Sequence, residues 1–330
     1  MTQLNLGKPD LGKVVLTVGD WSPEGWISHL ERHVPREDVI FTDGKTPPSP
    51  DICAQVKYAV AWHTPDGFFA NFPNLKAILS TGAGVDHLVR RADLAENVAI
   101  IRVIDPDLTG RVTAWTVMNV IAHHRQALDY LDAQNQAEWN PLPQTSAPDV
   151  RVGIMGFGEL GQSVAAVLKL LGYDLAGWAR SPRPNADIPV FSGLGELDAF
   201  LARTDILICL LPLTNETREI LNADLFAKLP QDGVTGGPFV INGGRGGHQN
   251  EADLLQALQD GTLKGASIDV FHQEPLPSDN PLWKAPNILI TPHTAGMSAP
   301  ESLLGRMVDN LIAFASGKTL DNLVDRKAGY

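Results

Sequence analysis

Short apolar runs alternate with stretches of helical periodicity along most of the chain. In the first hundred residues the runs "KVVLTVG", "YAVAW", "LKAILSTG" and "VAIIRV" are separated by longer, more polar segments. This alternation is typical of α/β proteins, in which strands and helices follow one another and the sheet is mainly parallel. We find no internal sequence repeat of fixed period.

A second series of the same kind begins at Val150 and predicts further strands with helices between most of them. The clearest helix is "NEADLLQALQDG", where three leucines share one face and Gly261 is a C-terminal cap. Strands that alternate with helices indicate right-handed crossovers within a parallel sheet. The predicted strands are 151–155, 174–178, 205–210, 238–242, 265–270 and 287–291.

Three segments outside these series have their own patterns. Residues 113–135 have apolar positions at mostly helical spacing and predict one long helix. Residues 140–149, "NPLPQTSAPD", have no periodicity and several prolines, which indicates a linker. Residues 299–318 predict a final amphipathic helix.

Length and charge narrow the class of protein. A chain of 330 residues is longer than a typical single domain, which favours two domains. The hydrophobic fraction of 44% and the charged fraction of 19% suit a globular protein with a substantial core. The formal charge of −12 argues against nucleic acid or an anionic membrane as a partner, so an anionic ligand needs a locally positive pocket.

Targeting signals and metal-ligand patterns are not apparent in the sequence. The N-terminus has no apolar signal region and no run is long enough to span a membrane, so we expect a cytoplasmic protein. The two cysteines, Cys53 and Cys209, do not suggest a disulfide framework, and Cys209 lies in an apolar run. The histidines have no metal-ligand spacing, and the adjacent His123 and His124 point in different directions on a helix, so we expect no metal.

The segment "RVGIMGFGELG", residues 151–161, is an apolar strand that leads into Gly-x-Gly-x-x-Gly and then a helix. In a dinucleotide-binding turn, Gly156 permits the tight turn, Gly158 lets a phosphate approach the backbone, and Gly161 lets helix and strand pack closely. The N–H groups at the start of the helix then bind the pyrophosphate. The strand before and the helix after the turn make this motif more specific than the glycines alone.

The acidic residue expected about 20 residues after such a turn is missing. An Asp or Glu there binds the ribose hydroxyls of NAD and repels a 2′-phosphate, but this chain reads "WARSPR" and has Ala179 at the position. Arg180, Ser181 and Arg183 can instead form charge-assisted and neutral hydrogen bonds with a phosphate. The segment therefore predicts NADP(H) as the preferred cofactor. The alternative is that the arginines are solvated loop residues and NAD(H) is used.

Three successive predicted strands are followed by one Arg, one Glu and one His. Because the carboxyl ends of parallel strands meet at one edge of a sheet, Arg245, Glu274 and His293 are expected to lie together. His293 can protonate the alkoxide that forms when a 2-keto acid is reduced, and Glu274 would favour its imidazolium form. Arg245 can bind the substrate carboxylate and polarise the keto oxygen.

The motifs "IMGFGELG", "INGGRGG", "ASIDVFHQEPLP" and "ILITPHTAG" together resemble the D-2-hydroxyacid dehydrogenase family, in order and spacing. The resemblance covers nearly the whole chain and is most specific from 151 to 296. It assigns the catalytic roles to Arg245, Glu274 and His293, and an Asp near the nicotinamide carboxamide to Asp269. It also implies that the N–H groups of Ala83, Gly84 and Val85 hold the substrate carboxylate. The cofactor contacts that it implies, besides the glycines and Arg180, Ser181 and Arg183, are Glu159, Leu160, Leu211, Pro212, Thr217, Gly243, Asp269, His293 and Ala295.

The same resemblance implies two doubly wound parallel-sheet domains, the Rossmann-type nucleotide domain being inserted in the substrate domain. We expect the substrate domain at 1–112 and 297–330, and the nucleotide domain, with the long helix, at 113–296. The family is dimeric, so we expect a homodimer with 113–135 at the interface. Many members have Val-Ala-Glu where this chain has Val112, Thr113 and Ala114, so no role is transferred from that glutamate.

Within the family, "YAVAWHTP" and "AGVDHL" look most like the bacterial glyoxylate/hydroxypyruvate reductases. That likeness implies a substrate-pocket role for Trp62 and a contact with the partner subunit's site for Trp139. Either tryptophan has the alternative interpretation of a plain core or surface residue. Glyoxylate and hydroxypyruvate differ by one hydroxymethyl group, a difference of about 1–3 kcal/mol in a pocket, and the sequence does not choose between them.

Other functions remain as alternatives or are disfavoured. Formate dehydrogenases have Gln where this chain has Glu274, and the phosphoglycerate enzymes often carry a further C-terminal domain for which no residues are expected here. A dehydrogenase for a larger 2-hydroxy acid is one alternative. A dinucleotide-sensing binding protein without turnover is the other, from a different functional class.

Overall fold

The computed structural model describes residues 11–19, 22–62, 64–82, 84–297, 300–327 and 329. Contacts divide the chain into two compact units, Met1–Asp107 with Ser298–Tyr330, and Leu108–Met297. Each unit has its own sheet, and every strand pair in both sheets is parallel. The predicted fold class, two parallel-sheet domains with one inserted in the other, is therefore confirmed.

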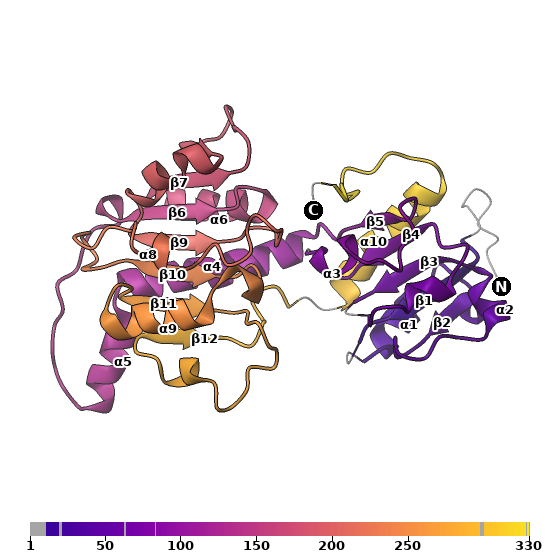
Figure 1. Ribbon diagram of the computed structural model, residues 1–330, viewed down its shortest axis with the longest axis horizontal. Helices are drawn as coiled ribbons and strands as arrows, with labels where there is room; N and C mark the ends of the chain where they lie inside the picture. Colours follow the sequence, from indigo (N-terminus) through magenta and orange to yellow (C-terminus); the bar gives the residue numbers. More distant parts are fainter. Residues whose placement is uncertain are drawn as a thin grey trace. The chain divides into compact units, whose positions relative to one another are not determined.

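The sheet of the first unit has five strands in the order β2-β1-β3-β4-β5. Alternate residues of these strands enter two separate apolar clusters, so both faces of the sheet are covered. On one face, Val14 and Leu16 pack with Trp26 and with Leu304 and Leu311 of the last helix. In Figure 1 this yellow helix lies among the indigo and purple elements of the first unit. The strands are β1 (Lys13–Thr17), β2 (Val39–Phe41), β3 (Val56–Ala61), β4 (Ala77–Ser80) and β5 (Ala99–Ile101), and the helices are α1 (Glu24–Leu30), α2 (Pro50–Cys53), α3 (Asp86–Val89) and α10 (Pro300–Ala315).

The sheet of the second unit has seven strands in the order β12-β11-β10-β9-β6-β7-β8. The chain winds outward in one direction from β6 to β8 and then in the other from β9 to β12, so the order reverses between β6 and β9. Ligands of doubly wound sheets bind outside the carboxyl ends at such a reversal. The strands are β6 (Arg151–Met155), β7 (Asp174–Ala179), β8 (Val190–Ser192), β9 (Ile206–Cys209), β10 (Phe239–Asn242), β11 (Gly265–Ile268) and β12 (Ile288–Ile290), and the helices are α4 (Pro106–His124), α5 (Ala127–Asn135), α6 (Glu159–Leu170), α7 (Leu197–Leu201), α8 (Ala223–Phe226) and α9 (Glu251–Asp260).

The single long helix predicted for 113–135 is wrong in two respects. The helix α4 begins earlier, at Pro106, and ends at His124, after which a second helix, α5, begins at Ala127. Gln126 between them has a left-handed backbone with φ of 55°. The side chains of Arg125 and Gln126 bond to Gln144 and to the carbonyl of Pro143, so contacts with the returning loop accompany the break.

The two sheets contain strands that the apolar pattern did not predict. Strands β2 and β8 have three residues each and lie at the edges of their sheets. The edge strands β5 and β12 are equally short but lie in the predicted runs "VAIIRV" and 287–291, whereas no run was predicted at β2 or β8. The six strands predicted from 151 onward all form, each within two residues of its predicted ends.

Candidate active site

The glycine turn after β6 has the geometry that its sequence predicts. Gly156 has φ of +97°, and a Cβ there would lie 2.5 Å from the carbonyl oxygen of Leu210. A Cβ on Gly161 would collide with the carbonyl oxygen of Gly156, so helix α6 packs directly against the turn. Only glycine fits either position without movement of the backbone.

Gly158, the middle glycine of the turn, leaves room for a dinucleotide. Apart from Gly158 itself and its two chain neighbours, no described atom lies within 4 Å of the place where a Cβ on Gly158 would be. Gly158 is also the N-cap of α6, a helix of 12 residues, whose first N–H groups have no partners within the helix. Glu159 and Leu160 follow in its first turn. A pyrophosphate can therefore approach this backbone closely, and the residues present fit a dinucleotide cofactor.

The neighbouring strand β7 ends at Ala179, the position where an acidic residue was expected and not found. Ala179 is buried, whereas Arg180, Ser181 and Arg183 in the loop that follows are exposed. Because β6 and β7 are adjacent and parallel, this loop and the glycine turn lie at the same edge of the sheet. The charge at the end of β7 is therefore positive, as a phosphate site requires.

The loop after β9 contains the predicted cofactor contacts Leu211, Pro212 and Thr217. The Thr217 hydroxyl donates to the carbonyl of Pro212 at 2.7 Å and accepts from the N–H of Thr214 at 2.8 Å. Thr217 and Leu211 are both buried. In this structure the hydroxyl of Thr217 therefore links two backbone groups of its own loop and stabilises the conformation of that loop.

The candidate catalytic residues follow three adjacent strands. Arg245 lies in the loop after β10, Glu274 in the loop after β11, and His293 in the loop after β12. The strands are neighbours in the sheet and run parallel, so their carboxyl ends lie at one edge. The second unit therefore brings these side chains to the same edge as the glycine turn.

Glu274 and His293 are in direct contact. His293 Nδ1 lies 2.6 Å from Glu274 Oε2, and Glu274 Oε1 accepts the N–H of Phe271 at 2.9 Å. Burial by itself would raise the pKa of the Glu274 carboxyl. The hydrogen bond from His293, that from Phe271 and the charges of His293 and Arg245 outweigh burial and hold this pKa below its ordinary value of 4.5. An ionised Glu274 accepts from Nδ1, which leaves Nε2 as the ring nitrogen available to a substrate.

The loop that carries Arg245 is held by its own short-range bonds. The N–H of Arg245 donates to His248 Nδ1 at 3.0 Å, and the Arg245 carbonyl accepts from Asn242 Nδ2 at 3.1 Å. One guanidinium nitrogen of Arg245 donates to the carbonyl of Gly244 at 2.9 Å. The side chain is half-buried. Its charge reaches Glu274, whose pKa it lowers.

Asp269 lies directly after β11 and is almost fully buried. Its Oδ1 accepts from the Thr291 hydroxyl at 2.5 Å and from the N–H of Thr294 at 2.9 Å, while Oδ2 accepts from the N–H of Ala295 at 3.0 Å. Its main-chain carbonyl accepts the N–H of His293 at 2.8 Å. Both oxygens of the carboxylate therefore accept hydrogen bonds from the loop that carries His293.

His293 itself has a left-handed backbone, with φ of 54°. A residue with a side chain adopts this conformation uncommonly, and the surrounding structure has to enforce it. The bonds from Asp269 to the residues on either side of His293 provide that enforcement. The predicted cofactor contacts Ala295 and Gly243 lie in these same loops, Ala295 being buried and Gly243 half-buried.

The predicted substrate residues outside this unit lie in the first unit, also after the carboxyl ends of strands. Trp62 follows β3, and its ring covers Gly82 so closely that a Cβ on Gly82 would collide with it. The ring also contacts His87 edge-on, with ring centres 4.9 Å apart. Gly84 and Val85 directly precede α3. Ala83, the other predicted residue of this loop, lies outside the described residues.

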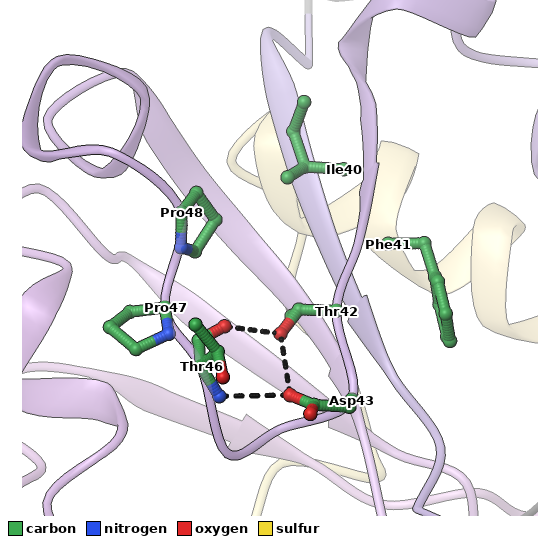
Figure 2. A pocket seen from close by; sticks show the side chains of 7 residues that line it. All are labelled: Ile40, Phe41, Thr42, Asp43, Thr46, Pro47 and Pro48. Carbon is green, nitrogen blue, oxygen red and sulfur yellow. Dashed lines mark hydrogen bonds between the residues drawn. The ribbon is translucent and has the colours of Figure 1, made fainter.

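A separate pocket of about 350 Å³ lies beside the edge strand β2 in the first unit (Figure 2). Its only charged lining residue is Asp43, whose Oδ1 accepts the N–H groups of Lys45 and Thr46, each at 2.8 Å. These bonds lower the pKa of the Asp43 carboxyl. The other lining residues are Ile40, Phe41, Thr42, Thr46, Pro47 and Pro48. The acid stabilises a turn, and this pocket lacks a set of groups for catalysis.

In the part of the chain that the structure describes, the His, Cys, Asp and Glu side chains form no group of three that could hold a metal ion. His123 bonds to Ser267 at 2.8 Å, and burial lowers its pKa to about 4, so this histidine is neutral at physiological pH. Among the described helices, none combines the length and hydropathy needed to cross a membrane.

A doubly wound sheet, a glycine turn at its reversal and an Arg–Glu–His set at the same edge define a dinucleotide-dependent oxidoreductase. Comparison with known proteins specifies the family. Residues 117–295 match the family model described as D-isomer specific 2-hydroxyacid dehydrogenase, NAD binding domain. The chain belongs to this family, as the motifs predicted.

Relatives along the whole chain agree with this assignment. The glyoxylate/hydroxypyruvate reductase A of Serratia proteamaculans is 34% identical over 94% of this chain and 97% of that protein. The enzyme of the same name from Salmonella paratyphi B is 36% identical over 92% of this chain and 96% of that protein.

Solved structures are similar over the same extent. A probable 2-hydroxyacid dehydrogenase from Rhizobium etli, in complex with NADP, HEPES and L(+)-tartaric acid, has a TM-score of 0.87 and 39% identity, covering 96% of this chain and 100% of that one. An NADPH-dependent glyoxylate/hydroxypyruvate reductase from Sinorhizobium meliloti, in complex with NADP and sulfate, has a TM-score of 0.86 and 40% identity, covering 96% and 99%.

Sequence reasoning did not identify two residues that contact the candidate catalytic loops. Thr291 bonds to Asp269, and Trp115 on α4 bonds to Thr291. Thr291 stands at the end of a predicted strand, two residues before His293, and that position was a usable signal. Trp115 has no comparable signal, because a tryptophan within the apolar pattern of a helix reads as core.

The Glu274–His293 pair predicts a specific dependence of stability on pH. A carboxyl whose pKa is lower in the folded than in the unfolded protein stabilises the fold above its unfolded pKa, and loses this effect as the pH falls through its folded pKa. We expect the urea midpoint of the wild type to exceed that of Glu274→Gln at neutral pH, and the difference to shrink progressively as the pH falls below 4.5 and through the lower pKa of the folded state. The effect will be small, since both side chains are about one-third exposed.

The control for this measurement is Glu138→Gln, which changes an exposed glutamate of the same unit. It should leave the urea midpoint unaltered across the same pH range. A difference between wild type and Glu274→Gln that persists unchanged in acid would contradict the assigned pairing.

Proposed function

We propose that this protein reduces a small 2-keto acid, glyoxylate or hydroxypyruvate, to the D-2-hydroxy acid with NADPH as the preferred reductant. The observation that carries the proposal is the 2.6 Å contact between His293 and an ionised Glu274, beside Arg245, in a unit with a dinucleotide turn. The relatives named above support the substrate, since their names are those of glyoxylate/hydroxypyruvate reductases. Family membership supports the D configuration of the product.

In the proposed reaction, His293 is the general acid. Its Nδ1–H is held by Glu274, which orients the ring and stabilises the imidazolium, and its Nε2–H gives a proton to the keto oxygen as that oxygen becomes an alkoxide. Arg245 binds the substrate carboxylate and polarises the keto group. NADPH, when bound, supplies the hydride to the keto carbon. In the oxidative direction His293 acts as the base.

The preference for NADPH follows from the end of β7. The dinucleotide pyrophosphate binds the turn of Gly156, Gly158 and Gly161, and the 2′-phosphate binds Arg180, Ser181 and Arg183. Ala179 removes the repulsion that an acidic residue would exert on this phosphate. Solved relatives that contain NADP or NADPH support this choice of cofactor.

Substrate specificity in this proposal also involves the first unit. The N–H groups of Ala83, Gly84 and Val85 bind the carboxylate, and Trp62 forms an apolar wall for the small substrate. The packing of Trp62 over Gly82 and against His87 supports this role, because it limits the positions that the ring can take.

We further propose that the protein is a homodimer through α4 and α5. The exposed residues of α4 include Ala114, Met118 and Ile121, which lie three or four positions apart and form an apolar stripe. None of the residues of α5, all of which the structure describes, is buried. An apolar face of this kind in a family enzyme fits contact with a second copy better than contact with water.

The loop after α5 supports the same proposal. Trp139 in this loop is 99% exposed. The returning segment is nevertheless ordered by bonds from Arg125, Gln126 and Tyr130 to residues 142–144. An exposed tryptophan on a loop that is held by hydrogen bonds can contact a partner subunit without first being ordered.

The His293 assignment is tested with purified protein, by following NADPH absorbance with glyoxylate and with hydroxypyruvate. The wild type should turn over, and His293→Ala should lose at least about 10²-fold in kcat because the proton donor is gone. NADPH affinity, measured by calorimetry, should be retained. A variant with full activity would overturn the role of His293, and a wild type inactive on every small 2-keto acid would favour a dinucleotide-sensing protein.

The phosphate site is tested by comparing the two cofactors. Arg180→Ala should raise the Kd for NADPH about 10- to 100-fold, because a charge-assisted bond is lost, and change the Kd for NADH little. Arg32→Ala, which removes an exposed arginine of the first unit, is the control and should alter neither. Equal effects of Arg180→Ala on both cofactors would refute the assignment.

The dimer is tested by light scattering after size-exclusion chromatography. The wild type should have twice the mass of one chain, and Met118→Glu should shift it to the monomer, because a charge is placed in the apolar stripe. Leu170→Glu replaces another exposed apolar residue of the same unit and should remain dimeric. A monomeric wild type, or a Met118→Glu variant that remains dimeric, would disprove this interface.

A further inference from the structure

Trp115 lies on α4 and is almost fully buried within the second unit. Its indole Nε1–H donates to the hydroxyl of Thr291 at 3.0 Å, and this hydroxyl in turn donates to Asp269 Oδ1 at 2.5 Å. The three residues come from parts of the chain far apart in sequence. They form a continuous chain of hydrogen bonds that ends on the carboxylate organising the His293 loop.

The direction of these bonds is determined by the chemistry of the groups. An indole nitrogen only donates, so the Thr291 oxygen must accept from Trp115, and its own proton is then free to go to Asp269. Without the indole, the Thr291 hydroxyl loses the hydrogen bond that helps to fix its orientation. The bond to Asp269 and the position of the loop between them would then be less well defined.

The ring of Trp115 also contacts the loop of the other catalytic residue. A Cβ on Gly243 would lie 3.0 Å from Trp115 Cζ3, so the ring packs against the backbone two residues before Arg245. One side chain therefore touches the loop of Arg245 by packing and the loop of His293 by a hydrogen bond. Neither contact involves Glu274.

Helix α4, which carries Trp115, is itself fixed to the rest of the unit by side-chain contacts. Thr113, two residues before Trp115, bonds to Ser163 of α6 at 2.9 Å. His123, two turns later, bonds to Ser267 of β11 at 2.8 Å and stacks on Phe239 of β10. The helix is thus fixed to the unit on both sides of Trp115, so that the indole has a defined position relative to the sheet.

His293 needs such support because its left-handed backbone is intrinsically unfavourable. If the loop relaxes, the imidazole moves relative to Glu274 and to the substrate. A small displacement of a proton donor lowers the rate of proton transfer more than it lowers the binding of substrate or cofactor.

We propose that Trp115 is a positioning residue for catalysis, which holds the His293 loop through Thr291 and Asp269 and the Arg245 loop through Gly243. The inference deepens the proposed reductase function and rests on it for its kinetic part. Its structural part, the position of the His293 ring, can be measured without turnover. The two parts are therefore tested separately.

The kinetic test compares Trp115→Phe, Thr291→Val and the double variant at saturating NADPH. Trp115→Phe keeps most of the ring and removes the N–H, and should lower kcat about tenfold with little change in KM for glyoxylate. Because both residues act through one chain of bonds, the double variant should be no slower than Thr291→Val alone. Thr291→Ser, which keeps the hydroxyl, should restore most of the lost kcat.

The matched control is Trp178→Phe. Trp178 is also buried in this unit and also donates its indole N–H over 3.0 Å, but to the carbonyl of Gly193, which is in none of the catalytic loops. Its kcat at saturating NADPH should equal that of the wild type. A Trp115→Phe enzyme with wild-type kcat, or a double variant in which the two losses multiply, would overturn the proposal.

The structural test uses protein labelled with ¹⁵N in its histidines, without substrate. The ring signals of His293, assigned from their loss in His293→Gln, should shift in Trp115→Phe and in Thr291→Val but not in Trp178→Phe. Unchanged His293 signals in both variants would overturn the proposal even if the wild type proved inactive on 2-keto acids, an outcome that by itself would contradict only the reductase function. Should Trp115→Phe fail to fold, Thr291→Val provides the same comparison.

Discussion

Because β10, β11 and β12 run parallel and side by side, the loops that follow them leave the sheet at one edge. Everything else in the candidate active site depends on this constraint. Arg245, Glu274 and His293 are separated by 19 or more residues in sequence, yet each needs only a short loop to reach the same region. The glycine turn after β6 opens at that edge as well, so the cofactor and the proton donor share one face of the unit.

The sheet brings the loops together, but a buried carboxylate shapes the loop that carries His293. Both carboxylate oxygens of Asp269 accept hydrogen bonds, from Thr291, Thr294 and Ala295, and none of these donors is charged. A buried carboxylate that lost these donors would be costly, so the loop and the acid stabilise each other. The resemblance to the family suggested a contact with the nicotinamide carboxamide for Asp269, and that role stays a prediction beside the contacts described here.

Much of this was accessible from the sequence, for reasons that differ between residues. The strand ends and the glycine turn were predictable because they depend on local patterns: apolar runs of fixed length and the steric demands at Gly156 and Gly161. The Arg, Glu and His set was predictable because the loops that follow neighbouring parallel strands all lie at one edge of the sheet. The absence of an acidic residue at Ala179 was also predictable, because it depends on the residue type at a single position.

The remainder depends on tertiary contacts that no local pattern encodes. The break between α4 and α5 coincides with bonds from Gln126 to a loop 17 residues away. Trp115 reads as an ordinary core residue until the fold puts its N–H against Thr291, which is 176 residues further along the chain.

The return of α10 to the first unit has a consequence for the order of folding during synthesis. Leu303, Leu304, Met307, Val308 and Leu311 of this helix belong to the apolar cluster that covers one face of the N-terminal sheet. They leave the ribosome after every residue of the second unit. The unit translated first therefore cannot complete its core until the last, whereas the inserted unit can fold as soon as residue 297 has emerged. During that interval an apolar sheet face stays uncovered, which makes the nascent chain a natural client for chaperones that bind exposed hydrophobic surface.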